Sequence, residues 1–464
     1  MSTGIKTTQR LSAQSINAFE SRIRGEIVRP SDAGYDQARR VWNAAVNRRP
    51  ELIVRPKNVD DVIQAIDFAR GNDLPLAMRG GGHSPAGYGT VEAGLVIDFS
   101  KMKGIEVDTN QSIASAQPGL TWAEFSNQAQ TYGLATPGAD VGAVGIAGTT
   151  LGGGMNWLMR KHGMTIDNVV AVDLVTADGQ LVTASAEETP DLFWALRGGG
   201  GNFGVATRFH YRLHFVETVL GGALVYPATR EGLRSYADVI AEAPDELTTI
   251  TFIQKAPPLP FIPEEARGTP AHIILPVYSG DAEAGEQALA PLRALAGKTP
   301  IADTMQMVAY PAMFFMTDPA GISRSHAVRN AYLRQLNDET IEAILDFVSR
   351  ATSPFGLVSL RELGGAMARV PIEETAFAHR DKAFYFAIDN AWDDTSSPEP
   401  HIAWTESFWQ AVAQYTDGAY SAYLGGEDRV RSAYPPATYT RLAEVKKRYD
   451  PDNLFRINAN ILPE

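Results

Sequence analysis

Glycine clusters at three places in the first half of the chain set the strongest limit on its fold. The sequence RGGGHS at residues 79–84 puts three consecutive glycines directly before a histidine. Residues 137–154 hold seven glycines in eighteen positions, and residues 198–204 contain a further run. Glycine tolerates positive φ angles and close approach of its backbone to another group, at an entropic cost. The segment 137–154 is therefore not expected to form a regular helix or strand.

Backbone N–H groups in such loops can form a concave binding site for an anion. Clusters spread over more than 100 residues suit a long ligand, such as a dinucleotide laid across a crevice. The alternative is a set of independent tight turns, although ordinary turns use only one or two glycines.

The third cluster contains the glycine pattern of one kind of dinucleotide site, the Rossmann site. Residues 199–204, GGGNFG, match the pattern G-x-G-x-x-G. A Rossmann site needs a strand, then the glycines, then a helix. Here a helical segment, PDLFWALR, comes first and a strand, VATRFHYRL, follows. The reversed order argues against a nicotinamide site of this type.

Size and composition exclude several functional classes. A chain of 464 residues is expected to form two or more lobes. The formal net charge of −13 argues against nucleic acid or an anionic membrane as partner. The absence of cysteine excludes disulfides, thiolate catalysis and cysteine-ligated metal. His210 and His214 would lie about 13 Å apart on one strand face, so no metal site is predicted.

The sequence carries no signal for a membrane or an export pathway. Its polar start, MSTGIKTTQRLSAQS, has no apolar core segment and no small-residue cleavage site. No run approaches 18 consecutive apolar residues. We expect a soluble, cytoplasmic protein, either a monomer or a homodimer.

Hydrophobic periodicity places the first glycine cluster at the end of a strand–helix–strand unit. LIVR reads as a strand, Asn58 as the N-cap of a helix over VDDVIQAIDFAR, and LPLAMRG as the strand that follows. GLVIDFS and IASAQPG are predicted strands, and TWAEFSNQAQTYG is a predicted helix. The pair Asp178–Gly179 predicts a hairpin turn.

The pattern changes after about residue 217, where the glycine clusters stop. Alternating strands such as HIILPVYSG and AFYFAIDNAW are mixed with longer helices such as DETIEAILDFVSRA. We interpret this part as a second lobe. The proline-rich segment 255–270 is expected at a surface or at the mouth of a pocket. The chain ends in a predicted helix followed by an ordered tail.

Taken together, these segments carry a resemblance to a known family. The chain resembles the vanillyl-alcohol-oxidase superfamily of flavoproteins, and specifically its berberine-bridge-enzyme-like branch. The matching pieces follow the family's order and spacing over essentially the whole chain. They are LIVRPKNVDDV, MRGGGHSPAGYG, GLVIDFSKMKGIEVD, residues 137–179, PDLFWALRGGGGNFGVAT and RYDPDNLFRINANI.

The resemblance implies an α+β, two-lobed FAD-binding fold of the PCMH type. Residues 1–217 would form the FAD-binding lobe, and residues 218–420 a substrate-binding lobe with an antiparallel sheet flanked by helices. Residues 421–464 would form a C-terminal segment that returns to the FAD lobe. FAD is the implied cofactor.

In many members of this family, the histidine of the R-x-G-G-H motif is bound covalently to the 8α position of the flavin. The matching residue here is His83. Some members add a second bond from a cysteine, and Val141 stands at that position in this chain. The resemblance therefore implies one 8α-histidyl link, through His83.

The resemblance also implies which residues contact FAD. Gly80–Gly82 would offer N–H groups to the pyrophosphate, Asn202, Gly204 and Val205 would lie near the adenine or ribose, and four tail residues would close over the flavin ring. The full cofactor set is Arg79, Gly80, Gly81, Gly82, His83, Ser84, Gly87, Pro137, Gly138, Gly142, Gly145, Gly148, Thr149, Gly152, Gly153, Asn202, Gly204, Val205, Asn453, Phe455, Asn458 and Asn460.

Flavin oxidation also needs a base for the substrate's O–H or N–H proton. Tyr420 and Tyr423 match the tyrosines of a Y-V-N-[FY] motif found in bacterial members, whose asparagine is replaced by Ala422. Both tyrosines could instead pack in a core. In plant members a glutamate base occupies the place of Arg369.

Two further residues are candidates for the catalytic base. Glu362 could act as the base if its strand faces the flavin, or could form an ion pair with Arg361 or Arg369. His379 could lie on the substrate face or be a structural histidine.

The resulting hypothesis is an FAD-dependent oxidoreductase. It would oxidise an alcohol, amine or phenolic carbon of a small, secondary-metabolite-like substrate by hydride transfer to flavin N5, with O2 as electron acceptor. Two alternatives stay open. Val144 and Ile146 could block oxygen and make the protein a dehydrogenase, or the altered motif positions could mean flavin binding without turnover.

Overall fold

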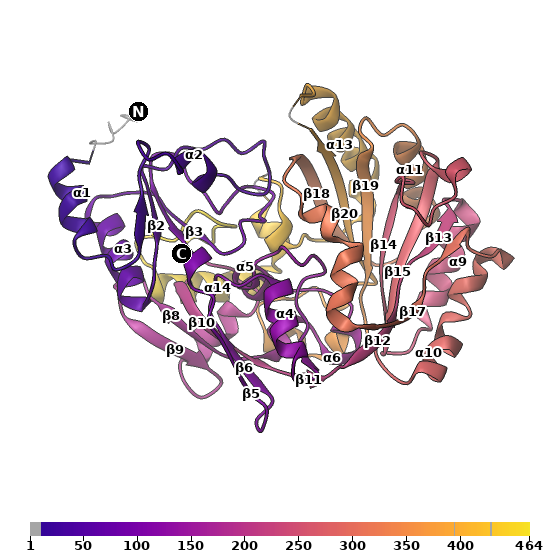
Figure 1. The fold of residues 1–464 in the computed structure, drawn as a ribbon, viewed down its shortest axis with the longest axis horizontal. Helices are drawn as coiled ribbons and strands as arrows, with labels where there is room; N and C mark the ends of the chain where they lie inside the picture. Colours follow the sequence, from indigo (N-terminus) through magenta and orange to yellow (C-terminus); the bar gives the residue numbers. More distant parts are fainter. Residues whose placement is uncertain (1–10, 394, 427–428) are drawn as a thin grey trace.

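The computed structural model describes residues 11–393, 395–426 and 429–464, so most of the polar N-terminal segment considered above lies outside the described residues. Two lobes lie side by side, and the chain passes from the first to the second near residue 217 (Figure 1). No helix in the described part of the chain is long and apolar enough to cross a membrane.

The first lobe begins with a four-stranded sheet that ends at the first glycine cluster. Its strand order is β1-β2-β4-β3, with β2 and β3 parallel to β4 and β1 antiparallel to β2. The predicted N-cap is confirmed, since the Asn58 side chain accepts a hydrogen bond of 3.0 Å from the Asp61 N–H. The elements are α1 (Ala13–Glu20), β1 (Glu26–Val28), α2 (Tyr35–Ala38), β2 (Leu52–Arg55), α3 (Val59–Gly71), β3 (Leu76–Arg79) and β4 (Leu95–Asp98).

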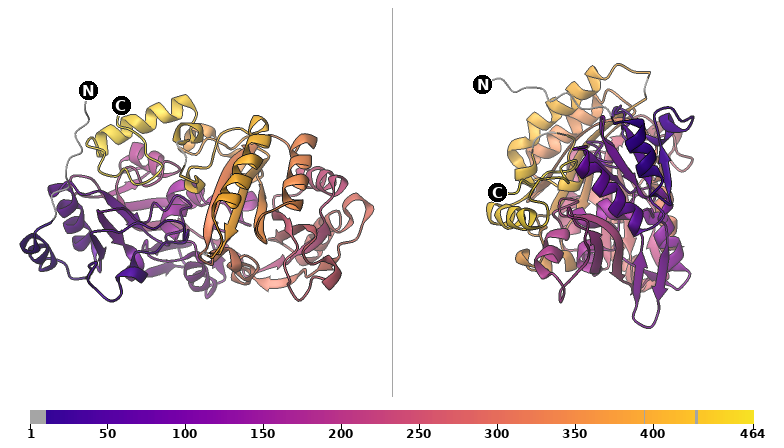
Figure 2. Two further views of the ribbon diagram at one scale, coloured as in Figure 1. Left: turned by 90° about the horizontal axis from the view of Figure 1, so that it is seen from above. Right: turned by 90° about the vertical axis from the view of Figure 1, so that its left-hand side faces the viewer.

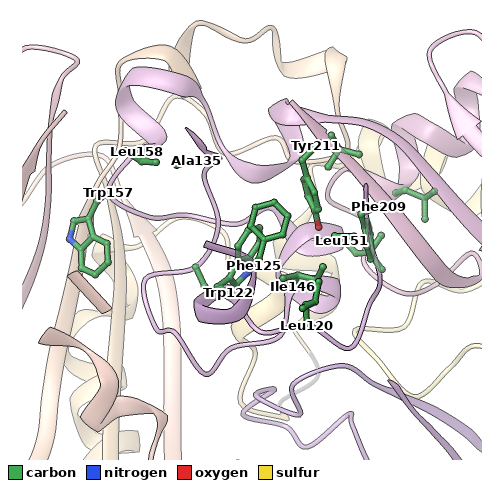
Figure 3. Packing of buried hydrophobic residues seen from close by; sticks show 14 of the residues in the cluster. Leu120, Trp122, Phe125, Ala135, Ile146, Leu151, Trp157, Leu158, Phe209 and Tyr211 are labelled. Carbon is green, nitrogen blue, oxygen red and sulfur yellow. The ribbon is translucent and has the colours of Figure 1, made fainter. Parts of the chain in front are cut away.

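A five-stranded antiparallel sheet completes this lobe, in the order β5-β6-β10-β8-β9. The predicted hairpin is confirmed, because Gly179 lies between β8 and β9 with φ of 86°. Helix α4 begins with a capping box at Thr121 and packs Trp122 and Phe125 against Tyr211 (Figure 3). The elements are β5 (Ile105–Asp108), β6 (Ile113–Ala116), α4 (Trp122–Gln130), β7 (Leu134–Ala135), α6 (Met159–His162), α7 (Thr165–Asn168), β8 (Val169–Val175), β9 (Leu181–Ser185), α8 (Pro190–Leu196), β10 (Val205–Arg212) and β11 (His214–Phe215).

The second glycine segment contains a short helix, so the prediction that it could not form one is wrong. Helix α5 (Ile146–Gly152) begins directly after Gly145. Ile146 and Leu151 are buried in the core of the lobe, whereas no atom lies within 4 Å of the point where a Gly148 side chain would begin. Burial of the apolar face outweighs the low helix propensity of glycine. The other face is left as bare backbone.

The second lobe is built on an antiparallel sheet of nine strands, with its main path β16-β13-β15-β14-β19-β20-β18. Alternate residues point to opposite faces. Ile253, Val358 and Ile388 pack against the helices α9, α11 and α13, whereas Phe252, Ser359 and others face the first lobe. The elements are β12 (Thr218–Gly221), β13 (Leu224–Pro227), α9 (Arg230–Ala241), β14 (Leu247–Lys255), β15 (Pro270–Tyr278), α10 (Ala282–Leu289), β16 (Ala302–Asp303), β17 (Gln306–Ala309), β18 (Ser325–Leu333), α11 (Asp338–Ser349), β19 (Phe355–Glu362), α12 (Ala366–Arg369), β20 (Phe384–Trp392) and α13 (Glu399–Val412).

The C-terminal segment lies against the first lobe. Helix α14 (Pro436–Tyr449), yellow in Figure 2, contacts α8, and both ends of the described chain lie on this side of the molecule. Lys446 fixes the helix in place, because its fully buried ammonium donates to Asn202 O at 2.8 Å, Phe455 O at 3.0 Å and Asp450 Oδ2 at 2.6 Å. The hydrogen bond to Asn202 O joins the tail to the third glycine cluster.

Replacement of Lys446 by methionine is expected to destabilise the protein. The substitution leaves the Asp450 carboxylate buried without its cation, and breaking a buried ion pair in this way costs about 3–5 kcal/mol. Chemical denaturation followed by circular dichroism measures the change. Lys447→Met, at an exposed position of the same helix, is the matched control and should change the free energy of unfolding little. Equal stabilities for the two variants would contradict the role given to Lys446.

Candidate cofactor and substrate site

A cavity of about 930 Å3 lies between the two lobes. One wall consists of the three glycine clusters, and the other is the face of the nine-stranded sheet that carries no helices. The proline-rich segment predicted at a pocket mouth also lines this cavity, through Pro257, Pro258, Leu259, Phe261 and Arg267.

The first two glycine clusters meet backbone to backbone. A side chain at Gly81 would begin 2.3 Å from the Gly145 nitrogen, and one at Gly145 would begin 2.2 Å from the Gly81 nitrogen. Neither position has room for another residue. Their contact brings the loop after β3 to the N-terminus of α5, so bare backbone from both segments lines the same part of the cavity.

His83 follows this contact and lines the cavity. Its ring stacks on Trp42, with centroids 5.6 Å apart, and the Trp42 ring also stacks on His326 at 3.8 Å. Burial lowers the pKa of His83 to about 4, and His326 contributes to the same shift. The imidazole is therefore neutral at neutral pH, with one nitrogen lone pair available for bonding.

Many of the predicted cofactor residues lie on the cavity wall. They come from all three glycine clusters and from the tail, which are far apart in the sequence. These residues are Arg79, Gly80, Gly81, Gly82, His83, Ser84, Gly145, Gly148, Thr149, Gly152, Asn202, Gly204, Val205 and Asn458.

Other predicted cofactor residues are not among the residues that line the cavity, and their contact with the cofactor stays a prediction. Gly87, Gly138 and Gly153 shape the loops, because a side chain there would meet Val46, Trp122 and Met164 respectively. Phe455 is fully buried in the core of the first lobe. The remaining members of this group are Pro137, Gly142, Asn453 and Asn460.

The opposite wall carries a tyrosine paired with a carboxylate. Tyr423 donates a hydrogen bond of 3.2 Å to Asp389 Oδ2, and Asp389 Oδ1 lies 2.9 Å from His326 Nδ1. Burial raises the pKa of Tyr423 well above its usual value, and the Asp389 charge raises it further. Tyr423 is therefore a phenol at neutral pH, and its proton points at an acceptor.

Tyr420 lines the cavity from the same segment but has a different environment. Its hydroxyl accepts a hydrogen bond of 3.0 Å from the Gly154 N–H. Burial raises the pKa of Tyr420 to about 12, although this bond and Arg361 oppose the shift. The hydroxyl thus holds the backbone at the end of α5, and among the described residues it has no carboxylate partner of the kind that Tyr423 has.

Glu362 does not face the cavity, so the structure corrects its assignment as a candidate base. It follows Arg361 on β19 and therefore points to the opposite face of the sheet. There it pairs with Arg160 at 2.5 Å, and not with Arg361 or Arg369. Burial raises the pKa of Glu362 to about 8, although the positive charge of Arg160 acts to lower it. Arg369 is exposed and pairs with Asp245.

His379 is also outside the cavity and is a structural histidine. Its Nε2 lies 3.0 Å from Ala433 O, and its ring stacks on Tyr332 with centroids 4.5 Å apart. Burial lowers the pKa of His379, so its ring is neutral at neutral pH. These contacts tie the second lobe to the C-terminal segment.

Several cavity residues were not found from the sequence. Asp389 and His326 meet only through the pairing of β18 with β20, which places residues 63 positions apart side by side. One signal was present: Asp389 is a charged residue inside the apolar strand AFYFAIDNAW. The other missed residues are Trp42, Asp140, Arg361 and Tyr385.

The described residues fit a large cofactor with a phosphate-bearing part. Bare backbone at Gly148 faces open space, and Asn458 Oδ1 is a buried acceptor without a hydrogen-bond partner among the described residues. The Asn458 amide group is held in place by bonds to Gly201 O and Phe455 O at 3.1 and 3.0 Å. Both features are expected where a ligand supplies the missing contacts.

Comparison with known proteins agrees with this assignment. A family profile described as FAD binding domain matches residues 50–185, and one described as berberine and berberine like matches residues 414–462. The first includes two of the glycine clusters, and the second includes Tyr420, Tyr423 and Asn458.

Individual relatives extend over nearly the full length. (R)-6-hydroxynicotine oxidase of Paenarthrobacter nicotinovorans is 31% identical over 461 residues, which cover 95% of this chain and 97% of the relative. An FAD-linked oxidoreductase of Dictyostelium discoideum is 29% identical and covers 97% of both chains.

Solved structures show the same architecture. The crystal structure of 6-hydroxy-D-nicotine oxidase from Arthrobacter nicotinovorans has a TM-score of 0.85 at 29% identity, covering 95% of this chain and 98% of the other. Glucooligosaccharide oxidase of Acremonium strictum has a TM-score of 0.87 at 23% identity, covering 97% and 98%. The predicted PCMH-type, two-lobed fold is thereby confirmed. The chain belongs to the berberine-bridge-enzyme-like branch of the vanillyl-alcohol-oxidase superfamily and is an FAD-linked oxidoreductase.

Proposed function

We propose that this protein is an oxidase that removes hydride from a carbon bearing a hydroxyl or amino group, or from a side-chain carbon of a phenol, in a small molecule. FAD, when bound, would supply the hydride acceptor at N5, and O2 would be the final electron acceptor. The single observation that carries the proposal is the Tyr423–Asp389 pair on the cavity wall opposite the glycine clusters. A proton acceptor and a cofactor cradle thus face one shared space.

The cofactor would be held by backbone more than by side chains. The N–H groups of the Gly80–Gly82 loop and of the first turn of α5 would bind the phosphates, because a glycine loop and a helix N-terminus both present backbone donors to an anion. Asn202 and Val205 line the same cavity. The Asn458 amide oxygen supports this arrangement, because it is a buried acceptor that needs a donor from the ligand.

His83 would form the covalent link to the flavin. A neutral imidazole is the nucleophilic form, and the lowered pKa of His83 supports that role at neutral pH. Glucooligosaccharide oxidase, a structural neighbour at 23% identity, carries FAD bound through both a cysteine and a histidine. This chain has no cysteine, so a single bond through His83 is proposed.

The protonated state of Tyr423 determines how it can act as a base. A phenol can take a proton from the substrate only if it gives up its own. We infer that the substrate proton moves to Tyr423 Oη while the phenol proton moves to Asp389 Oδ2, along the 3.2 Å hydrogen bond. His326 would hold the carboxylate in position from its other oxygen, at 2.9 Å.

The position of Ile146 supports O2 as the electron acceptor. Ile146 is fully buried in the core of the first lobe and does not line the cavity. Val144 does line it, next to Gly145. Only one of the two bulky residues that could exclude oxygen therefore faces the cofactor space.

Covalent attachment is expected to depend on His83. Acid-precipitated wild-type protein should stay yellow, because the flavin is bonded to the chain. His83→Ala should give a colourless precipitate with free FAD in the supernatant, measured by its absorbance. Ser84→Ala, at the neighbouring cavity position, is the control and should stay yellow. A colourless wild-type precipitate would remove the covalent link from the proposal and leave FAD binding to be tested separately.

Replacement of Tyr423 by phenylalanine should slow the chemical step by about 10²–10⁴-fold, the range for loss of a general base. The measurement is anaerobic flavin bleaching by whichever substrate reduces the wild-type protein fastest in a panel of alcohols, phenols and amines. Asp389→Asn should slow the same step, because the amide cannot accept the phenol proton in the same way.

Tyr226→Phe is the matched control for this measurement. Tyr226 donates to Leu292 O on the helix side of the sheet, outside the cavity. Its loss should leave the rate of flavin reduction unchanged. Unaltered reduction in Tyr423→Phe would show that another group takes the proton.

A further inference from the structure

Arg361 lies on the cavity wall opposite the glycine clusters, which we call the substrate wall. Its contacts within the protein engage only some of its hydrogen-bond donors. Its side chain is 15% exposed and lines the cavity. One guanidinium nitrogen donates to Asp140 Oδ2 at 2.5 Å, and the other to Ser359 Oγ at 3.0 Å. The group also lies 5.2 Å from the centre of the Tyr385 ring.

The guanidinium therefore has donors left for a ligand. Arginine has five N–H groups in a planar fork, and within the described part of the chain only these two hydrogen bonds are found for Arg361. Burial opposes the charge, but the adjacent Asp140 carboxylate keeps the pKa of Arg361 above its usual value. The side chain is therefore a permanent cation. Asp140 and Ser359 hold the guanidinium in place, and the group also lines the cavity.

Tyr385 supplies a second donor beside Arg361. Arg361 and Tyr385 are paired across β19 and β20, so their side chains lie on the same face. Tyr385 is 2% exposed and lines the cavity, and its hydroxyl has no hydrogen-bond partner among the described residues. Burial raises the pKa of Tyr385 far above its usual value, so the hydroxyl remains a donor at neutral pH.

The negative groups of the cavity are already engaged. Among the described lining residues the carboxylates are Asp140, which pairs with Arg361, and Asp389, which contacts Tyr423 and His326. No carboxylate on the described wall is left to bind a protonated amine. By contrast, Arg267 at the cavity mouth bonds only to backbone carbonyls.

We propose that Arg361 and Tyr385 form a subsite for an anionic oxygen of the substrate, either a carboxylate or a phenolate. The substrate is then an organic acid or an acidic phenol, and a protonated amine is selected against. Arginine binds carboxylates through parallel N–H···O bonds that add specificity as well as affinity. This assignment rests on the proposed function only in treating the bound molecule as the substrate.

The sheet register sets the size of that substrate. Arg361 pairs with Tyr385, and Leu357 pairs with Asp389, so the anion subsite and the Tyr423–Asp389 pair lie four residues apart along neighbouring strands. At 3.3 Å per residue this separation is about 13 Å between backbones. A molecule with one aromatic ring and a short side chain can span the space between the inward-pointing side chains.

Three probes of the same shape test the subsite. Benzoate, benzamide and benzamidinium differ in charge but hardly in size, and their binding to the oxidised holoenzyme is followed by perturbation of the flavin absorbance. Benzoate should bind at least tenfold more tightly than benzamide, and benzamidinium should not bind. A second pair, 4-nitrophenolate and nitrobenzene, shows whether a phenolate is preferred in the same way as a carboxylate.

Substitutions at Arg361 and Asp140 should shift the benzoate affinity in opposite directions. Arg361→Gln should remove the preference for benzoate over benzamide. Asp140→Asn should strengthen benzoate binding severalfold, because the guanidinium loses its internal anion; general damage to the fold would not produce this result. Tyr385→Phe should weaken benzoate binding, and Tyr226→Phe, which lies outside the cavity, is the control that leaves the preference intact.

Equal binding of benzoate and benzamide to the wild-type protein overturns the proposal, as does weaker benzoate binding in Asp140→Asn. The proposal is also overturned if Arg361→Gln alters the flavin spectrum but still prefers benzoate to benzamide. That result would mean that Arg361 contacts the cofactor and not the anionic oxygen of the substrate. Failure of the proposed function gives a different result. The wild-type protein then still binds benzoate more tightly than benzamide, but no alcohol, phenol or amine in the panel reduces the flavin.

Discussion

The backbone contact between Gly81 and Gly145 is the constraint on which the rest of the site depends. Each residue lies within 2.3 Å of where the other's side chain would begin, so any larger residue would push the two loops apart. The contact joins the end of a parallel β-unit to the start of α5. His83 follows one loop, and Asp140 and Val141 precede the other. The proposed phosphate-binding loops and the proposed attachment residue, His83, therefore all lie beside this contact.

The two lobes are joined by ion pairs that fix how the substrate wall faces the cradle. Arg361 and Glu362 are neighbours on β19, yet they point to opposite faces of the sheet. One pairs with Asp140 and the other with Arg160, both in the first lobe. Arg380 adds a third link to Asp167, at 2.7 Å. Strand β19 is thus held to the first lobe from both of its faces.

Local features were predictable because they depend on neighbouring residues. The Asn58 cap, the turn at Gly179 and the helix-then-strand order around the third glycine cluster all follow from short-range chemistry, and the family resemblance correctly identified the fold. The helix α5 was missed because burial of Ile146 and Leu151 outweighs glycine propensity. Glu362 was misplaced because one residue of register moves a side chain to the other face. The Asp389–His326 contact depends on strand pairing, which one sequence does not reveal.

We propose that the cavity holds FAD between His83 and the Tyr423–Asp389 pair. A crystal structure of the purified protein with 4-nitrophenolate bound tests it most directly. We expect continuous electron density from the His83 ring to the flavin, with Tyr423 Oη on the same side of the flavin ring as the bound ligand. Flavin density separate from His83, or a flavin whose N5 faces away from Tyr423, would contradict it.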